Sequence, residues 1–350
     1  MNKEYKTSIS LVVYNGAKYL PFCLAGVDEQ TTKDFFLLII DNASIDNSFK
    51  IITDFLITNP ELNHRTRIVK NNKNLGFARA HNQAFQWTSS QYVLLLNQDV
   101  LMDKDYLSKL LPFADEHPPV AATQGKILKW TFNSATYRLD LHKNLHKVSK
   151  FDSCGLAVNK NRHTFNINQG DFDQGQAEVN TEIFGVSGTA PLYRRLALED
   201  IKYNDQILDE DFVTYKEDID IAWRLRLAGY QSWYLPQAVC FHDRSLAKPE
   251  RLSLVTQARA NWPEQMKVYS CRNHWLVLIK NDCLGNLILQ SPYIFWYELK
   301  KFIYRLFFET KILFKAVSQF FFLIPTMLTK RAYIQKKKVI SCHELKKWFL

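Results

Sequence analysis

Two adjacent carboxylates, Glu217 and Asp218, begin a run of residues with the spacing of an amphipathic helix. Ile221 and Leu225 fall on one face of this run, and Gly229 stands where a helix commonly ends. The free N–H groups and the macrodipole of a first helical turn stabilise anions. An ionised carboxylate in that place suits a general base that takes a proton from a bound hydroxyl. For a lone pair of acids, helix capping on a solvated face is the alternative explanation.

The chain that must position these acids has 350 residues, of which 47% are hydrophobic and 23% charged. This is enough for a large core in one extended domain or two. The polar start, without an apolar signal region, predicts a protein that is not exported. The six cysteines are scattered and include no Cys-x-x-Cys pair. Their spacing argues against a zinc site or a disulfide framework and favours a reducing compartment.

The net charge of +10 is concentrated at the end of the sequence. Residues 296–350 contain twelve Lys or Arg and three acidic residues, so the rest of the chain carries only about +1. These basic residues are interleaved with Phe and aliphatic residues and belong to no recognised RNA- or DNA-binding motif. Nucleic-acid binding is therefore disfavoured.

Short apolar runs alternate with helical patterns in the first part of the chain, which is typical of a mostly parallel sheet flanked by helices. Strands are predicted at residues 8–13, 35–40, 67–69, 92–96 and 120–129, and helices at about 47–58, 76–87 and 103–116. A polar cluster follows each of the first four strands: Tyr14-Asn15-Gly16, Asp41 to Asp46, Asn71 to Gly76, and Asn97-Gln98-Asp99. Ligands bind at the carboxyl edge of such sheets, so the clusters predict one shared site, although turn chemistry explains any single one.

The second half of the chain is less regular. Residues from about 130 to 180 are polar and lack a clean period, which predicts an insertion or a mobile loop region. Short strands are expected at 231–235 and 238–242, and the remainder is mostly helical. We expect a first domain of residues 1–283, containing the insertion, and a basic amphipathic helical region of residues 284–350.

Six motifs follow one another along the chain in the order found in a known enzyme family. They are Val12 to Gly16, Asp41-Asn42-Ala43-Ser44 with Asp46, Asn72 to Asn82, Leu94 to Val100, Val186-Ser187-Gly188, and Asp209 to Asp220. Over residues 8–283 the chain resembles the inverting nucleotide-sugar glycosyltransferases of family 2, which have the Rossmann-like GT-A fold. Within them it resembles the bacterial rhamnosyltransferase-like branch. The resemblance implies transfer of a sugar, with L-rhamnose from dTDP-rhamnose as the branch's example, to a saccharide or polyprenyl-linked saccharide in cell-surface polysaccharide synthesis.

The resemblance also implies which residues bind the donor, a dTDP- or UDP-sugar. Asp41 would accept hydrogen bonds from the nucleotide base, with Tyr14 and Asn15 beside it. The other donor-binding positions that it implies are Asn74, Gly76, Asn82, Asn97 and Gly188. Taken alone, Asp41 is equally explained as a helix cap, and Asn74 and Gly76 as a plain turn.

A divalent cation, Mg²⁺ or Mn²⁺, is implied at the triplet Asn97-Gln98-Asp99. Family members hold such a cation with an Asp-x-Asp-like sequence, and hard cations of this kind prefer oxygen ligands shared with substrate phosphate. Asp99 fits this pattern, whereas Asn97 departs from its acidic first position. His242 matches a further ligand in related enzymes, and a packed histidine is the alternative.

The implied reaction is one displacement that inverts the anomeric centre and needs no nucleophilic side chain. Asp218 matches the family's catalytic base. Glu217 would orient the acceptor or the donor, and Arg224, two turns along the same helix, would orient a substrate or pair with a carboxylate. The cation would stabilise the charge that develops on the leaving diphosphate.

The basic tail predicts contact with a membrane. Residues 316–329 are uncharged but interrupted by Pro325 and are shorter than the roughly 20 apolar residues that a spanning helix needs. A helix lying in the interface of an anionic inner leaflet fits better and predicts a cytoplasmic, peripheral protein. Docking of this helix on the catalytic domain is the alternative.

Two other functions are compatible with parts of the sequence. A nucleotidyltransferase would also use a Rossmann-like sheet, but the first strand is not followed by a Gly-rich phosphate motif with Lys or Arg. A non-catalytic, membrane-associated assembly protein that binds nucleotide sugars is the other alternative. The intact acids Asp41, Asp99 and Asp218 argue against it.

Overall fold

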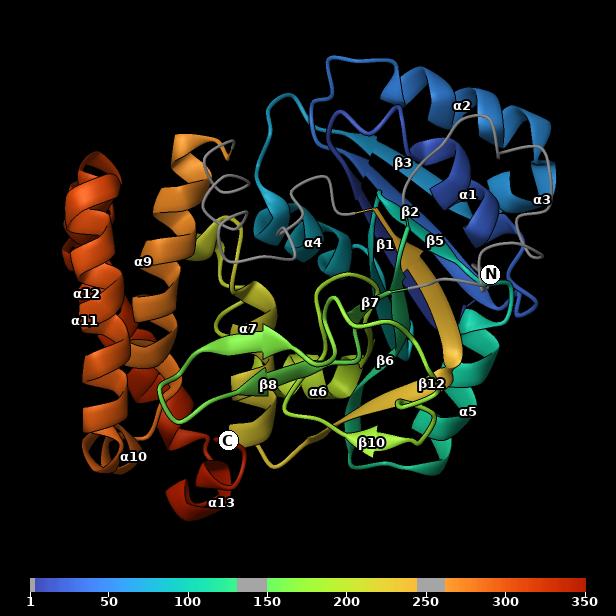
Figure 1. Cartoon of the computed structure of the whole chain (residues 1–350). Helices are drawn as coiled ribbons and strands as arrows, with labels where there is room; N and C mark the ends of the chain where they lie inside the picture. Colours follow the sequence, from blue (N-terminus) through green and yellow to red (C-terminus); the bar gives the residue numbers. More distant parts are fainter. Residues whose placement is uncertain (1–3, 131–149, 244–261) are drawn as a thin grey trace.

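A mixed sheet of ten strands organises the computed structural model, which describes residues 4–130, 150–243 and 262–350 (Figure 1). The strand order is β10-β12-β6-β11-β4-β1-β2-β3, with β5 beside β12 and β7 beside β6. Helices α1, α2 and α5 pack on one face of the sheet and α4 on the other. The α/β class predicted from the sequence is confirmed.

The first half of the chain forms the parallel part of the sheet. Its strands are β1 (Thr7–Val13), β2 (Phe35–Asp41), β3 (Thr66–Lys70) and β4 (Tyr92–Asn97), and its helices are α1 (Leu20–Asp28), α2 (Ser48–Thr58), α3 (Pro60–Asn63) and α4 (Phe77–Gln86). β1 lies between β2 and β4 and is parallel to both. β2 is almost wholly apolar because helices cover both of its faces.

The middle of the chain adds strands of both directions. These elements are β5 (Val100–Met102), α5 (Tyr106–Glu116), β6 (Val120–Lys129), β7 (Phe151–Ser153), β8 (Leu156–Val158), β9 (Thr164–Asn166), β10 (Thr181–Glu182), β11 (Leu192–Arg194), α6 (Arg195–Ile201), the 3₁₀ turn η2 (Glu210–Phe212), α7 (Glu217–Leu227) and β12 (Gln231–His242). β11 is antiparallel to both β4 and β6 and so joins the parallel half to the rest of the sheet.

Two details of this region differ from the sequence-based expectations. The strands expected at 231–235 and 238–242 form one strand, β12, whose pairing with β6 is irregular between Leu235 and Val239. Pro236 lies in that irregularity, where a residue without an N–H does not interrupt the ladder. Of the expected insertion, residues 131–149 lie outside the described residues, and the rest contains β7, β8 and β9, which the sequence pattern did not indicate.

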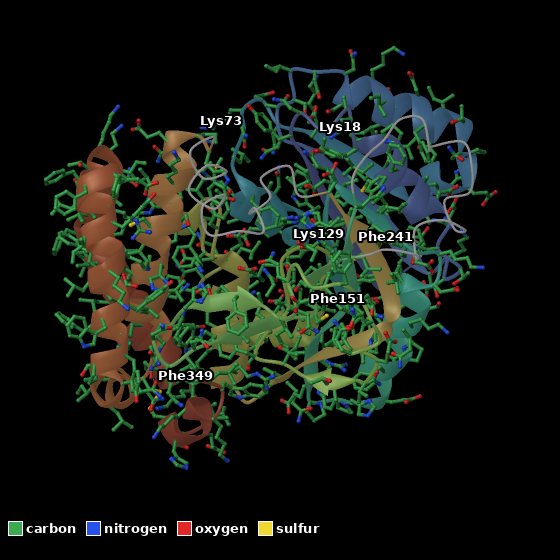
Figure 2. The ribbon with its side chains drawn as sticks, in the orientation of Figure 1. Lys18, Lys73, Lys129, Phe151, Phe241 and Phe349 are labelled. Atoms are coloured by element: carbon green, nitrogen blue, oxygen red, sulfur yellow. A yellow bond between two sulfur atoms is a disulfide. The ribbon has the colours of Figure 1, made fainter. Side chains whose placement is uncertain are left out.

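Two large hydrophobic clusters lie on the two faces of the sheet, and a third joins α7 to the end of the chain. Phe151 and Phe241 belong to the second cluster, which lies in the interior of the molecule (Figure 2). The third cluster contains Trp223 of α7 together with Phe349, whose ring centroid lies 5.7 Å from that of Trp223. The helix that begins with Glu217 is therefore buried against the C-terminal region.

The C-terminal region is helical, as expected. It consists of α9 (Glu264–Asn281), α10 (Leu284–Leu289), α11 (Ser291–Phe308), α12 (Thr310–Lys336) and α13 (Cys342–Lys346). α9 packs along α12 and also touches α7 (Figure 1). The boundary expected near residue 283 falls between α9 and α10.

A buried network of ion pairs fixes these helices to the back of α7. The Lys280 ammonium lies 2.6 Å from Asp209 and 2.8 Å from Asp220, and Lys330 of α12 also pairs with Asp209. Arg224 pairs with Asp220 at 2.7 Å. Burial by itself raises the pKa of Asp220, but Arg224 and Lys280 more than offset this effect and lower it. The charges are thus compensated within the core.

Two features of the tail were not expected from the sequence. Cys283 and Cys342 form a disulfide between the starts of α10 and α13, although they lie 59 residues apart in sequence, so spacing alone gave no sign of the pair. The uncharged stretch around Pro325 is part of a 27-residue helix, α12, which is long and apolar enough to cross a membrane by length and composition.

Replacing Lys280 with Met is expected to lower the free energy of unfolding by about 3–5 kcal/mol, because two buried carboxylates lose a compensating charge. The measurement is urea-induced unfolding. Lys50→Met, which removes an exposed ion pair with Asp54, is the control and is expected to cost less than about 0.5 kcal/mol. If the two substitutions lowered the free energy of unfolding equally, the buried network would not stabilise the fold more than an exposed ion pair does.

Candidate active site

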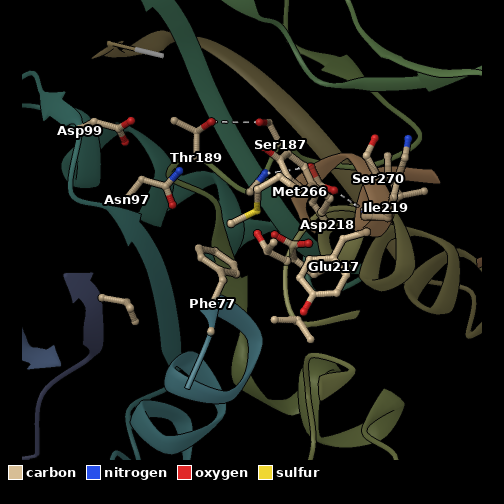
Figure 3. A pocket seen from close by; sticks show the side chains of 18 of the residues that line it. Phe77, Asn97, Asp99, Ser187, Thr189, Glu217, Asp218, Ile219, Met266 and Ser270 are labelled. Atoms are coloured by element: carbon tan, nitrogen blue, oxygen red, sulfur yellow. Dashed lines mark hydrogen bonds between the residues drawn. The ribbon is translucent and has the colours of Figure 1, made fainter. Parts of the chain in front are cut away.

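A cleft of about 880 Å³ lies where the carboxyl ends of β1 and β4 meet the start of α7 and the first turns of α9. Asn97 and Asp99 line one side of it, and Glu217 and Asp218 line the opposite side (Figure 3). The cleft therefore joins two motifs that are more than a hundred residues apart in the sequence. It is formed at the sheet edge where the polar clusters were expected.

The two acids of α7 enter the cleft because the chain turns sharply before the helix. Tyr215 and Lys216 have φ angles of 67° and 74°, in the left-handed region. One oxygen of Asp218 accepts a hydrogen bond from the N–H of Ile219 (2.8 Å), and the other accepts one from the N–H of Gly188 (3.3 Å). The carboxylate is thus held by two backbone donors at a helix N-terminus.

Glu217 has a different environment from its neighbour. Its Oε2 atom is buried and has no hydrogen-bond partner within the described part of the chain. Burial, together with the charge of Asp218, raises the pKa of the Glu217 carboxyl to about 8. Glu217 is therefore mostly protonated at neutral pH.

Asp99 and His242 form the other polar group of the cleft. β12 pairs with β5 so that His242 lies opposite Val100, next to Asp99. The Nε2 atom of His242 lies 3.3 Å from Asp99, and its Nδ1 atom lies 2.9 Å from the buried Asp152. Burial lowers the pKa of His242, but the hydrogen bonds with Asp152 and Asp99 more than offset this and raise it to about 9.

The polar turns that follow the first four strands contact one another through amide side chains. Gln98 accepts a hydrogen bond from the N–H of Tyr14 and donates one to its carbonyl oxygen. Asn42 donates to Asn74 and accepts from the N–H of Leu75. Gln98 and Asn42 lie inside the motifs Asn97-Gln98-Asp99 and Asp41-Asn42-Ala43-Ser44, but nothing in the sequence marks them as separate contributors.

The residues expected to bind the donor divide into two groups. Tyr14, Asn74, Gly76, Asn97 and Gly188 line the cleft. Asp41, the last residue of β2, and Asn15, in the turn after β1, lie beside it. Asp41 is fully buried, accepts a hydrogen bond from the N–H of Ser44 and has one buried oxygen without a partner among the described residues. Asn15 accepts a hydrogen bond from the N–H of Ile45.

Asn82 and Arg224 do not line the cleft, and Arg224 pairs with a carboxylate, which is one of the two roles expected for it. Asn82 is buried and accepts hydrogen bonds from the N–H groups of Ile207 and Leu208. Arg224 is 3% exposed and donates to the carbonyl oxygens of Ile201 and Ile207, in addition to its ion pair with Asp220. Asn82 of α4 and Arg224 of α7 both point toward the core, where they hold the segment before α7 in place.

The far end of the cleft is formed by residues that no motif indicated. Met266, Tyr269 and Ser270 of α9 line it, opposite Phe165 of β9. Trp262 lies next to them, with its ring stacked on that of Tyr215 at a centroid distance of 5.3 Å. These residues follow a region with no clear sequence pattern, so only the tertiary fold brings them to the site.

The sheet, its polar edge and the paired acids on α7 define a glycosyltransferase of the GT-A type. The chain belongs to glycosyl transferase family 2, whose sequence model matches residues 8–202, more than half of its length. It is 25% identical over 290 residues to the poly-β-1,6-N-acetyl-D-glucosamine synthase of Staphylococcus epidermidis, a match that covers 82% of this chain and 60% of that protein. The corresponding synthase of Staphylococcus aureus (strain COL) is 25% identical over 255 residues, 73% of this chain and 53% of the relative. The chain thus spans between about half and 60% of these relatives.

Solved structures share the fold at low sequence identity. GalNAc-T7 with UDP, GalNAc and Mn²⁺ superposes with a TM-score of 0.61 at 12% identity, over 98% of this chain and 56% of that one. The fragment 1–349 of S. aureus TarS in complex with UDP-GlcNAc gives a TM-score of 0.54 at 16% identity, over 95% of this chain and 89% of that one. These similarities confirm the GT-A architecture.

The pKa of His242 provides a test of the cleft geometry. In the metal-free protein we expect NMR titration of the His242 ring to give a pKa of about 9, and Asp152→Asn to move it down toward 6.5, because the neutral amide no longer stabilises the imidazolium. The exposed His117 ring is the internal control and should not respond to the substitution. An unchanged His242 titration in Asp152→Asn would contradict the contact.

Proposed function

We propose that the protein is an inverting glycosyltransferase that moves a sugar from a nucleotide donor to a saccharide or lipid-linked saccharide acceptor. The observation that carries the proposal is the convergence of Asp99 and Asp218 on opposite sides of one cleft. Family 2 membership supplies the reaction class. A nucleotidyltransferase has no comparable need for a carboxylate facing an acceptor hydroxyl.

Asp218 acts as the base in this mechanism. It takes the proton of the acceptor hydroxyl while that oxygen forms a bond to the anomeric carbon and the bond from this carbon to the diphosphate oxygen breaks. The backbone N–H groups of Gly188 and Ile219 orient the carboxylate toward the cleft. The nucleoside diphosphate leaves with the bonding electron pair, and no side chain is modified.

Asp99 and His242 are the residues that would hold a divalent cation. A carboxylate oxygen and an imidazole nitrogen face each other at 3.3 Å, and Asp152 fixes the orientation of the ring from behind, as partners of metal-binding histidines do. Mn²⁺ or Mg²⁺ supplies stabilisation of the negative charge on the leaving diphosphate. Asn97, a neutral oxygen donor, lines the cleft beside Asp99. His242 must lose its ring proton to accept this role.

A UDP-activated N-acetylhexosamine is the donor that the relatives favour. Two of them are named poly-β-1,6-N-acetyl-D-glucosamine synthases, and TarS has been solved with UDP-GlcNAc. The rhamnose expectation rests on motif resemblance alone and predicts dTDP-rhamnose instead. A non-catalytic binding protein is the remaining alternative, and it predicts donor binding without turnover.

With Mn²⁺ present, wild-type protein is expected to hydrolyse UDP-GlcNAc faster than dTDP-rhamnose. Asp218→Asn is expected to lower this rate by about 10²- to 10⁴-fold, since the base is lost. UDP-GlcNAc should still raise the melting temperature of Asp218→Asn, which shows that binding survives. Equal hydrolysis by wild type and variant would refute the role of Asp218, and a preference for dTDP-rhamnose would restore the rhamnosyltransferase assignment.

The C-terminal helices support a peripheral position on the inner face of an anionic membrane. Trp296, Phe307 and Phe308 of α11 are 61%, 73% and 74% exposed, and Phe321 and Phe322 of α12 are 63% and 82% exposed. An exposed aromatic surface of this extent, flanked by Lys and Arg, is typical of helices that lie in the membrane interface. The ion pair of Lys330 with Asp209 holds α12 on the catalytic region, which favours an in-plane helix over a spanning one.

Replacing Phe307 and Phe308 together with Glu is expected to abolish cosedimentation with vesicles of equimolar phosphatidylcholine and phosphatidylglycerol. The substitutions remove apolar contact area and repel the anionic surface. Ile57→Glu, at a 74% exposed position on α2, is the matched control and should bind as wild type does. Wild-type protein that stays in the supernatant would refute the membrane assignment.

A further inference from the structure

Glu217 is the acid of the cleft that the base mechanism leaves without a task. Its carboxyl group lies between Phe77 and Asp218 (Figure 3). Phe77 follows Gly76 at the donor side of the cleft, and both line it. The left-handed turn at Tyr215 and Lys216 holds the Glu217 side chain in this position. The group is thus built into the site on the side where the donor sugar would lie.

Burial and the charge of Asp218 raise the pKa of Glu217 by more than the charge of the adjacent Lys216 lowers it. The neighbouring Lys216 donates a hydrogen bond to Thr164 of β9 at 2.6 Å. Arg224 is paired with Asp220 in the core behind the helix. The nearest charged or titratable groups on other elements include the buried phenol of Tyr193 on β11, which is itself held neutral by burial, because burial raises its pKa. Asp218 and Asp220 add only negative charge.

We propose that Glu217 works as a neutral carboxylic acid that donates a hydrogen bond to an oxygen of the donor sugar and leaves the role of base to Asp218. This inference rests on the proposed transferase function. Glu217 lines the cleft, and its carboxyl group has one oxygen, Oε2, without a hydrogen-bond partner among the described residues, so the group still has a hydrogen bond to make. A protonated carboxyl is a donor, whereas an ionised one only accepts.

Charge repulsion is the physical reason for giving the two acids different roles, with Glu217 neutral and Asp218 as the base. Two ionised carboxylates side by side repel each other and repel the diphosphate, on which negative charge grows during the reaction. A pKa of about 8 keeps Glu217 mostly protonated at neutral pH, and the proton of the acceptor hydroxyl goes to Asp218. The Glu217 proton stays on its carboxyl throughout, so the balance of the displacement is unchanged.

The first test uses the ligand-free protein and does not depend on activity. In the unfolded chain Glu217 ionises near 4.5, and in the folded protein near 8. The proton that only the folded state retains makes a stabilising contribution that is complete below pH 4.5 and is lost as the pH rises to 8. Glu217→Gln cannot titrate, so its stability relative to wild type should increase steadily from pH 5 to 8 and then level off. A constant difference across this range would show that Glu217 is ionised in the fold, and would overturn the proposal.

The second test measures binding of UDP-GlcNAc and of UDP, each with Mn²⁺, by calorimetry. At pH 7, Glu217→Gln should bind UDP-GlcNAc within about threefold of wild type, because the amide is also a donor, whereas Glu217→Ala should bind it about tenfold more weakly. Neither variant should alter binding of UDP, which lacks the N-acetylglucosamine group that Glu217 would contact. Above pH 8 wild type should lose affinity for UDP-GlcNAc and Glu217→Gln should not.

The outcomes of these tests separate the two ideas. Failure of wild type to bind any nucleotide sugar refutes the transferase proposal and leaves the stability result to decide the protonation of Glu217. Tight binding that is insensitive to Glu217→Ala, or a variant Glu217→Gln that binds as poorly as Glu217→Ala, refutes the hydrogen bond from a neutral acid.

Discussion

The parallel register of β1 with its two neighbours is the constraint on which the site depends. Val13 lies opposite Asp41 of β2, and Val12 lies opposite Asn97 of β4, so three strands end at the same level. The polar turns that follow these strands must then share one edge of the sheet. A slip of one residue in either pairing would turn the apolar side chains of β1 out of the core and separate these turns.

The opposite wall of the cleft depends on a buried structure of another kind. α7 presents Glu217 and Asp218 at its first turn, and its remaining length packs against α6, β12 and the C-terminal helices α9 and α12. Gly185 lies so close to α7 that a Cβ atom there would overlap Ala222. Lys280 fixes the helix from behind through Asp220. Rigid placement of this kind suits a base that must meet a substrate hydroxyl within hydrogen-bond distance.

Much of the parallel half could be predicted from the sequence, because its signals are local. Each strand is a short apolar run, and each functional turn follows directly, so Tyr14, Asn74 and Asn97 were placed correctly at the edge of the sheet. The Glu217-Asp218 pair was found because a helix start carries its own sequence pattern. Residue types and short spacings were sufficient for these features.

The features that the sequence did not reveal depend on tertiary contacts. The inward direction of Arg224 follows from the burial of α7 on all sides, which an amphipathic pattern does not show. The disulfide of Cys283 with Cys342 and the contribution of Tyr269 to the cleft both arise from the folding back of the terminal helices. Pairing of α9 with α12 across a long sequence separation has no local signal.

A crystal structure with Mn²⁺ and the nucleotide sugar that most stabilises the protein tests the central claim most directly. The account predicts an anomalous manganese peak at Asp99 and His242, the diphosphate beside it, and the anomeric carbon on the side of the cleft that faces Asp218. Nucleotide density elsewhere on the molecule, or a sugar directed away from Asp218, would contradict it.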